Sequence, residues 1–136
     1  MRFDELAVGQ AATLERTVSD GDVVAYAGIT GDDNPVHLDE VVAAKSRFGG
    51  RIAHGMLSAG FISATIGTRL PGPGSIYLGQ TLKFTAPVRI GDTVTTRVEV
   101  LELVPEKKRA KLGTRCVNQH GETVIDGDAL VMVPDE

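Results

Sequence analysis

The sequence predicts an α+β fold in which a curved antiparallel β-sheet wraps around one central helix. Residues 55–69 carry no charge before Arg69, and apolar or small side chains occur on every side of the helix they would form. That pattern is typical of a helix that is buried all round. Residues 76–133 then contain runs in which apolar and polar residues alternate, as in antiparallel strands with one buried face. A helix followed by such strands favours a sheet packed on the helix.

The length and composition fit one domain with one core. A chain of 136 residues is of that size, so we expect a single domain over residues 1–136. The net charge is −4 and the basic residues are spread along the chain, which argues against nucleic acid as the main partner. A single cysteine, Cys116, excludes an intramolecular disulfide and a zinc cluster of thiolates.

Neither a targeting signal nor a membrane span is expected. Residues 1–8 are mixed and acidic, and they lack a basic segment followed by an apolar one. The longest weakly polar stretch, residues 55–68, is too short to cross a bilayer and contains Ser58, Ser63 and Thr65. The sequence therefore predicts a cytoplasmic protein that does not bind membranes.

The elements before the central helix are shorter. Residues 13–18 are expected to form a first strand, and residues 19–29 a helix with an apolar stripe. Ser19 can cap the start of that helix, and Asp22 follows three residues later in a variant of the capping box. Residues 31–36 are expected to form a polar loop, and residues 38–46 a second short helix.

Four long strands are expected after the central helix, which a Pro-Gly-Pro-Gly segment at residues 71–74 brings to an end. The strands are predicted at residues 76–86, 94–100, 110–119 and 123–133, with a turn at His120-Gly121 between the last two. Cys116 alternates with apolar neighbours and is expected in the core, whereas His120 is expected in solvent. The outer edge of such a sheet stays open, which favours pairing with a second subunit.

The segment from Gly31 to His37 carries the strongest indication of chemistry. Pro35 favours an extended conformation at Asn34, so the segment is expected to be a loop. Asp32 and His37, five residues apart across that turn, can reach the same small volume. A carboxylate and an imidazole that share one water molecule suit general acid–base catalysis.

The same segment allows two other interpretations. Asp-Asn-Pro is also common turn chemistry, and His37 could merely cap the next helix. A calcium loop would use Asp32 and Asn34, but Val36 stands at the next ligand position and His37 replaces the glycine needed for the turn. Calcium binding is therefore rejected, and the turn interpretation stays open beside the catalytic one.

The start of the central helix, His54-Gly55-Met56, is a second candidate site. The first amides of a helix lack intrahelical partners and lie at the positive end of its dipole. Gly55 has no side chain to block approach, so its N–H could bind a thioester oxygen as an oxyanion hole. The alternative is that this glycine allows close helix packing. Ser63 could contact a ligand about two turns further on, although a serine in a buried helix more often bonds to its own backbone.

Together these segments resemble the (R)-specific enoyl-CoA hydratase family, the MaoC-like branch of the hotdog fold. The run from Asp32 to His37 fits the family pattern D-x-N-P-x-H, which hotdog thioesterases generally lack. Residues 52–56, Ile-Ala-His-Gly-Met, fit the start of the family's helix. Residues 74–80, Gly-Ser-Ile-Tyr-Leu-Gly-Gln, with Phe84 and Pro87, fit the first strand after it. The resemblance covers nearly the whole chain in the right order.

The resemblance implies a hotdog fold, a homodimer and reversible syn addition of water to a trans-2-enoyl thioester, which gives an (R)-3-hydroxyacyl thioester. It assigns the catalytic pair to Asp32 and His37, and the oxyanion donor to the Gly55 amide. It places Asn34 and Ser63 at the substrate. No metal or redox cofactor is implied. The acyl carrier, coenzyme A or acyl carrier protein, is part of the substrate. The acyl group, the carrier and the physiological direction stay open.

Two other classes of function are alternatives. A hotdog acyl-CoA thioesterase would use a carboxylate and water to cleave the thioester and release a free thiol. A non-catalytic acyl-thioester sensor would bind its ligand without turnover, normally with an added DNA-binding segment for which this chain has no spare length. The D-x-N-P-x-H motif favours the hydratase over both.

Overall fold

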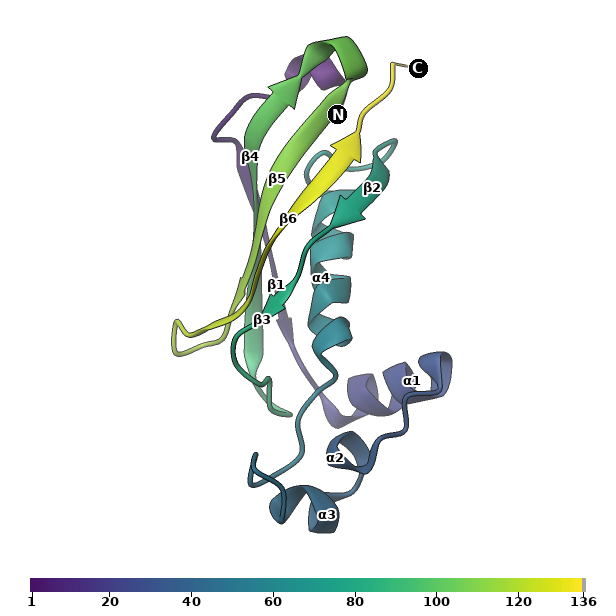
Figure 1. The fold of residues 1–136 in the computed structure, drawn as a ribbon, viewed down its shortest axis with the longest axis vertical. Helices are drawn as coiled ribbons and strands as arrows, with labels where there is room; N and C mark the ends of the chain where they lie inside the picture. The colour runs from purple at the N-terminus through teal and green to yellow at the C-terminus, as the bar shows by residue number, and fades with distance from the viewer. Residues whose placement is uncertain (136) are drawn as a thin grey trace.

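Six antiparallel strands form one sheet in the computed structural model, which describes residues 1–135. The strands are β1 (Ala11–Thr17), β2 (Ile76–Gln80), β3 (Lys83–Phe84), β4 (Thr93–Val104), β5 (Arg109–Val117) and β6 (Thr123–Met132). Their order is β1-β4-β5-β6-β2, and β3 also pairs with β6. The twisted sheet curves around α4 (Gly55–Thr68), as Figure 1 shows. The predicted α+β hotdog architecture is confirmed.

The predicted alternation along the strands is present, and its buried half forms the core under α4. Every second residue is buried in β4 (Val94, Thr96, Val98, Val100) and in β5 (Ala110, Leu112, Thr114, Cys116). Ile62 and Ile66 of α4 belong to the same hydrophobic cluster. Cys116 lies in this core as predicted, and burial raises the pKa of its thiol.

The central helix has one exposed face, which corrects the prediction of a helix buried all round. Its buried residues, which lie on the sheet side, are Ser58, Ala59, Ile62, Thr65 and Ile66. Its exposed residues include Met56, Gly60, Ser63 and Gly67, which recur every three or four positions. This stripe has no charge, so the sequence pattern does not distinguish it from a buried face. Among the helices of residues 1–135, none has the length and hydrophobicity needed to span a bilayer.

The strand predicted over residues 76–86 is broken into β2 and β3. The register shifts between Tyr77 and Gly79, and the chain then crosses Gly127 of β6. A Cβ at Gly127 would lie 1.9 Å from the carbonyl oxygen of Thr81, so only glycine permits this approach. Both halves keep β6 as their partner, and the break therefore leaves little trace in the alternation.

Three helices, α1 (Asp20–Thr30), α2 (Pro35–Leu38) and α3 (Glu40–Ala44), lie beyond one end of the sheet, next to the first turn of α4 (Figure 1). Ser19 caps α1 as predicted. Its hydroxyl accepts the Asp22 N–H at 3.1 Å, and the Asp22 carboxylate accepts the Ser19 N–H at 3.0 Å. This capping box fixes where the chain turns from β1 into α1.

The predicted loop over residues 31–36 and helix over residues 38–46 both need correction. Helix α2 already begins at Pro35, where a missing N–H costs nothing and φ is preset for a helix. Asn34 caps α2 by accepting the Val36 N–H at 3.1 Å. Asp39 separates α2 from α3 and caps α3 with its own carboxylate. His37 therefore lies on a short helix rather than in a loop.

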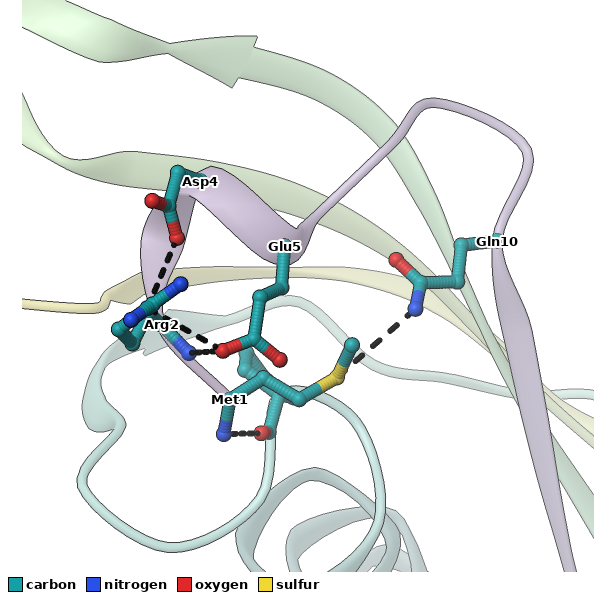
Figure 2. A network of polar contacts seen from close by, with 6 residues as sticks. Met1, Arg2, Asp4, Glu5 and Gln10 are labelled. Carbon is teal, nitrogen blue, oxygen red and sulfur yellow. Dashed lines mark hydrogen bonds and ion pairs between the residues drawn. The ribbon is translucent and has the colours of Figure 1, made fainter.

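The N-terminus is fixed at the opposite end of the molecule from α1–α3 (Figure 1). The Met1 ammonium group donates to the Pro71 carbonyl at 2.9 Å, and Arg2 pairs with Asp4 at 3.1 Å and with Glu5 at 3.3 Å (Figure 2). A 3₁₀ turn, η1 (Phe3–Glu5), buries Phe3 there, and a second, η2 (Pro105–Lys107), joins β4 to β5. These contacts hold the N-terminus in place at that end, whereas the candidate site lies at the end with α1–α3.

Candidate active site

Asp32 lies in the short loop between α1 and α2. Gly31 ends α1 in the left-handed conformation, with φ of 82° and its N–H bonded to the Ala27 carbonyl at 2.9 Å. The Asp32 carboxylate then accepts the Asn34 N–H at 3.3 Å, and the backbone N–H of Asp32 donates to the Thr30 hydroxyl at 3.2 Å. Asp32 stays exposed. The loop thus fixes the backbone of a carboxylate that solvent and ligands can reach.

His37 lies on α2 and is largely buried, with 9% of its surface exposed. Its Nδ1 lies 2.7 Å from the Ile52 carbonyl oxygen. Because a carbonyl can only accept, Nδ1 carries the proton of the neutral ring and Nε2 keeps its lone pair. The structure therefore orients His37 as a base or a hydrogen-bond acceptor through Nε2.

Asp32 and His37 come together as the sequence predicts. A carboxylate oxygen of Asp32 and a ring nitrogen of His37 lie within 4.8 Å of each other. Two hydrogen bonds of about 2.8 Å to one water oxygen span roughly 4.6 Å at a tetrahedral angle. The gap therefore suits one shared water molecule, with the carboxylate as acceptor on one side and an imidazole nitrogen on the other.

Arg51 binds the main chain of His37. Its Nε donates to the His37 carbonyl at 2.6 Å, and its guanidinium pairs with Asp20 of α1 at 2.6 Å. The Arg51 side chain is only 16% exposed. It joins α1 and α2, so the orientation of the two helices that flank the Asp32 loop depends on it. Nothing in the sequence pattern distinguishes Arg51 from an ordinary loop arginine.

His54 belongs to the predicted helix start, but the sequence pattern assigns no role to its side chain, which the structure places at the catalytic pair. It is 2% exposed, its Nε2 lies 2.9 Å from the Asp32 carbonyl oxygen, and its ring stacks on that of His37. A signal was available, because His54 stands at the N-cap of α4 and histidine is not among the preferred capping residues. Its side chain makes no capping hydrogen bond.

Gly55 opens α4 directly after His54 and borders a cavity of about 570 Å³. The cavity is lined mainly by apolar side chains from residues 84–88, from the start of β6 and from the first turn of α4. Ile52, whose carbonyl holds His37, lines the same cavity. Asp32 and His37 do not line it, so the pair lies beside the cavity and the segment from Ile52 to Gly55 separates the two.

The two predicted substrate contacts are placed differently. Asn34 stands between Asp32 and His37, with its side-chain oxygen engaged in the α2 cap and its amide NH₂ left to donate. Ser63 lies on the exposed face of α4, about 12 Å along the helix axis from Gly55 at about 1.5 Å per residue. Within one chain, Ser63 is not brought to the pair, and its contact with substrate stays a prediction.

A metal ion is the other occupant to consider at this site. Within residues 1–135, only one set of three His, Cys, Asp or Glu side chains has its ligand atoms close enough together for a metal ion, and it consists of Asp32, His37 and His54. The two imidazole rings are stacked, with centroids 3.8 Å apart and planes 30° from parallel. Lone pairs lie in the ring plane, so those of two stacked rings run side by side instead of converging on one ion. The arrangement therefore suits proton transfer better than metal binding.

The fold and this site define a class: a hotdog protein with a carboxylate–imidazole pair beside the first turn of its central helix. The chain belongs to the MaoC-like dehydratase family, whose model, described as "MaoC like domain", matches residues 5–122.

Relatives of this chain carry concordant names. A 3-hydroxybutyryl-CoA dehydratase from Methylorubrum extorquens is 56% identical over 97% of this chain and 83% of its own length. An (R)-specific enoyl-CoA hydratase from Aeromonas caviae is 45% identical over 98% of this chain and 100% of its own. The unliganded R-hydratase from Pseudomonas aeruginosa aligns with a TM-score of 0.95 at 51% identity, covering 99% of this chain and 86% of that one.

Proposed function

We propose that the protein is an (R)-specific enoyl-CoA hydratase, a hydro-lyase that adds water syn to a trans-2-enoyl-CoA and forms an (R)-3-hydroxyacyl-CoA. The reverse reaction is the dehydration of the 3-hydroxyacyl thioester. The observation that carries this proposal is the Asp32–His37 pair, held within 4.8 Å beside the start of α4. The hydratases and dehydratases among the relatives support the same reaction.

The proposed mechanism uses one shared water molecule. Asp32 and the Nε2 atom of His37 hold it, and one of them takes its proton as its oxygen adds to C3 of the enoyl group. A proton from the pair then reaches C2 from the same face, which makes the addition syn. The negative charge that builds on the thioester oxygen is bound by the Gly55 N–H at the positive end of the α4 dipole. Asn34 donates its amide N–H to the substrate.

The cavity beside Gly55 is the proposed space for the acyl chain. Its lining is mostly apolar, and a thioester oxygen at the Gly55 N–H would place the adjacent chain at the cavity's edge. The carrier, coenzyme A or acyl carrier protein, is part of the substrate, and the mechanism requires no metal and no redox cofactor. This expectation, like that of a cytoplasmic location, stays a prediction.

A direct assay tests the proposal. Purified protein is incubated with crotonyl-CoA and longer trans-2-enoyl-CoAs, and the loss of the enoyl-thioester absorbance is followed. Chiral analysis of the product is expected to give the (R)-3-hydroxyacyl thioester. A thiol reagent in a parallel reaction detects the alternative, because a thioesterase releases free thiol and a hydratase does not. Free thiol without a 3-hydroxyacyl product, or an (S) product, would overturn the proposal.

We further propose that the enzyme is a homodimer. The outer edge of β2 is unpaired within residues 1–135, and Ile76, Tyr77 and Leu78 are 43%, 40% and 42% exposed there. Helix α4 also has an exposed face without charge, which includes Met56, Gly60, Ser63 and Gly67. An open strand edge and an uncharged, exposed helix face both suit pairing with a second copy, edge to edge.

A further inference from the structure

We propose that His54 is a positioning residue that holds both members of the catalytic pair, Asp32 through its main chain and His37 through its ring. The inference rests on the proposed hydratase function and assigns a role to a residue outside the D-x-N-P-x-H motif. His54 touches neither the shared water nor the thioester in this assignment. It acts through Asp32 and His37, which hold the water.

The hydrogen bond of His54 sets its tautomer. Nε2 lies 2.9 Å from the main-chain carbonyl oxygen of Asp32, and a carbonyl can only accept, so Nε2 carries the proton. Nδ1 then holds a lone pair, and this buried atom has no hydrogen-bond partner in residues 1–135.

The tautomers of the two stacked rings are therefore opposite. His37 carries its proton on Nδ1, bonded to Ile52, whereas His54 carries its proton on Nε2, bonded to Asp32. Each ring is fixed in its own plane by one carbonyl. The stack, with centroids 3.8 Å apart, limits the remaining tilt of His37 out of its plane. His37 can then aim Nε2 at the shared water in only a narrow range of directions.

Tyr26 completes the arrangement. Its ring centroid lies 4.5 Å from that of His54, with the planes 44° apart. His54 thus connects α1 through Tyr26, the Asp32 loop through Nε2, and α2 through His37, while its own backbone opens α4. One side chain fixes the carboxylate and the imidazole relative to the helix start that carries the proposed oxyanion donor.

Three substitutions separate the two contacts. His54→Gln keeps an N–H donor near the position of Nε2 but removes the ring. His54→Phe keeps a stacking ring but removes the donor, and His54→Ala removes both. We expect His54→Ala to lower kcat about a hundredfold with KM changed less than about twofold, since misplacement by about 1 Å can cost that much. Gln and Phe are each expected to recover at least about fivefold over Ala.

His120 supplies the matched control, because it is exposed in the turn between β5 and β6 and forms its hydrogen bonds with Asn118 and Gln119. His120→Phe is expected to leave kcat unchanged. Nitrogen-15 NMR of the histidine rings in the unmodified enzyme provides a readout that does not depend on activity. It should report the Nε2–H tautomer for His54 and the Nδ1–H tautomer for His37.

Two results would overturn the role of His54. One is a kcat within twofold of the wild type for folded His54→Ala, while Asp32→Asn and His37→Asn are inactive; the hydratase proposal would then stand without this residue. The other is an Nδ1–H tautomer for His54, a result that remains decisive even if no His54 variant folds. Full activity of Asp32→Asn or His37→Asn would instead overturn the proposed function itself.

Discussion

The ring of Phe84 lies against Gly55 so closely that a Cβ at position 55 would be 2.8 Å from the ring carbon Cε1. The first residue of α4 is therefore crowded on one side by an aromatic ring from β3, and the glycine has a packing role whether or not its N–H binds substrate. Phe84 is 52% exposed, so its ring has room to move. A test of the oxyanion donor must separate these two roles.

We expect Gly55→Val to lower turnover at least about a hundredfold, because its side chain would keep the thioester oxygen away from the backbone N–H. We also expect a lower melting temperature, because the side chain displaces Phe84. Phe84→Ala removes the obstructing ring. In Gly55→Val/Phe84→Ala, the melting temperature is expected to recover while turnover stays low. Thermal unfolding and kinetics on the same preparations measure both. Recovery of turnover together with stability would leave packing as the reason for the glycine.

Asp32→Asn and His37→Asn are each expected to lower turnover at least about a hundredfold, the usual effect of losing a general acid or base. Asn at position 32 can still accept the Asn34 N–H, and Asn at position 37 can place a donor near the Ile52 carbonyl, so both variants should fold. Circular dichroism checks the fold, and enoyl-CoA hydration checks activity. Near-normal turnover in either folded variant contradicts the assignment.

Arg51→Met is expected to lower the free energy of unfolding by about 1–2 kcal/mol, because the partly buried His37 carbonyl loses a charged donor. Turnover should fall as well, since the α2 backbone that carries His37 is released. Urea unfolding measures the stability. Asp20→Asn is the control, because it removes only the exposed side of the Arg51 ion pair and should cost less than about 1 kcal/mol. Equal losses of unfolding free energy in Arg51→Met and Asp20→Asn would argue against a contribution from the contact with the His37 carbonyl.

Asp22 should make the stability depend on pH in the acid range. The Ser19 N–H that donates to its carboxylate lowers the pKa of Asp22 in the folded state. A lowered folded pKa means that the contribution is present above the unfolded pKa, which is about 3.9, and is lost as pH falls through the folded value. Urea unfolding should therefore show Asp22→Ala less stable than wild type at pH 7, with the difference shrinking below about pH 4. A difference that is constant with pH would show that the carboxylate charge does not contribute.

The dimer is expected to depend on the β2 edge. Leu78 and Leu101 are each 42% exposed and each lie at a shift in strand register, but only Leu78 is on the open edge. Leu78→Lys should shift the protein toward monomer in light scattering at micromolar concentration, whereas Leu101→Lys should not. A monomeric wild type, or the same shift from both variants, would count against pairing through this edge.

The sequence predicted the sheet, the central helix and the Asp32–His37 pair because each leaves a local signal. Alternation shows which face of β4 and β5 is buried, and Ser19 with Asp22 marks the start of α1. The pair belongs to one short segment in which Pro35 and Asn34 dictate the turn. Its two members are five residues apart, so no long-range fold information is needed to bring them together.

The tertiary structure alone decided the rest. His54 and Arg51 reach Asp32 and His37 across 22 and 14 residues of chain, and a contact over such a separation leaves no periodic pattern in the sequence. The break between β2 and β3 depends on Gly127 of a distant strand, and the exposed face of α4 depends on which side the sheet covers. Local patterns record what neighbouring residues dictate, whereas the packing of separate segments determines how His54 and Arg51 hold the pair.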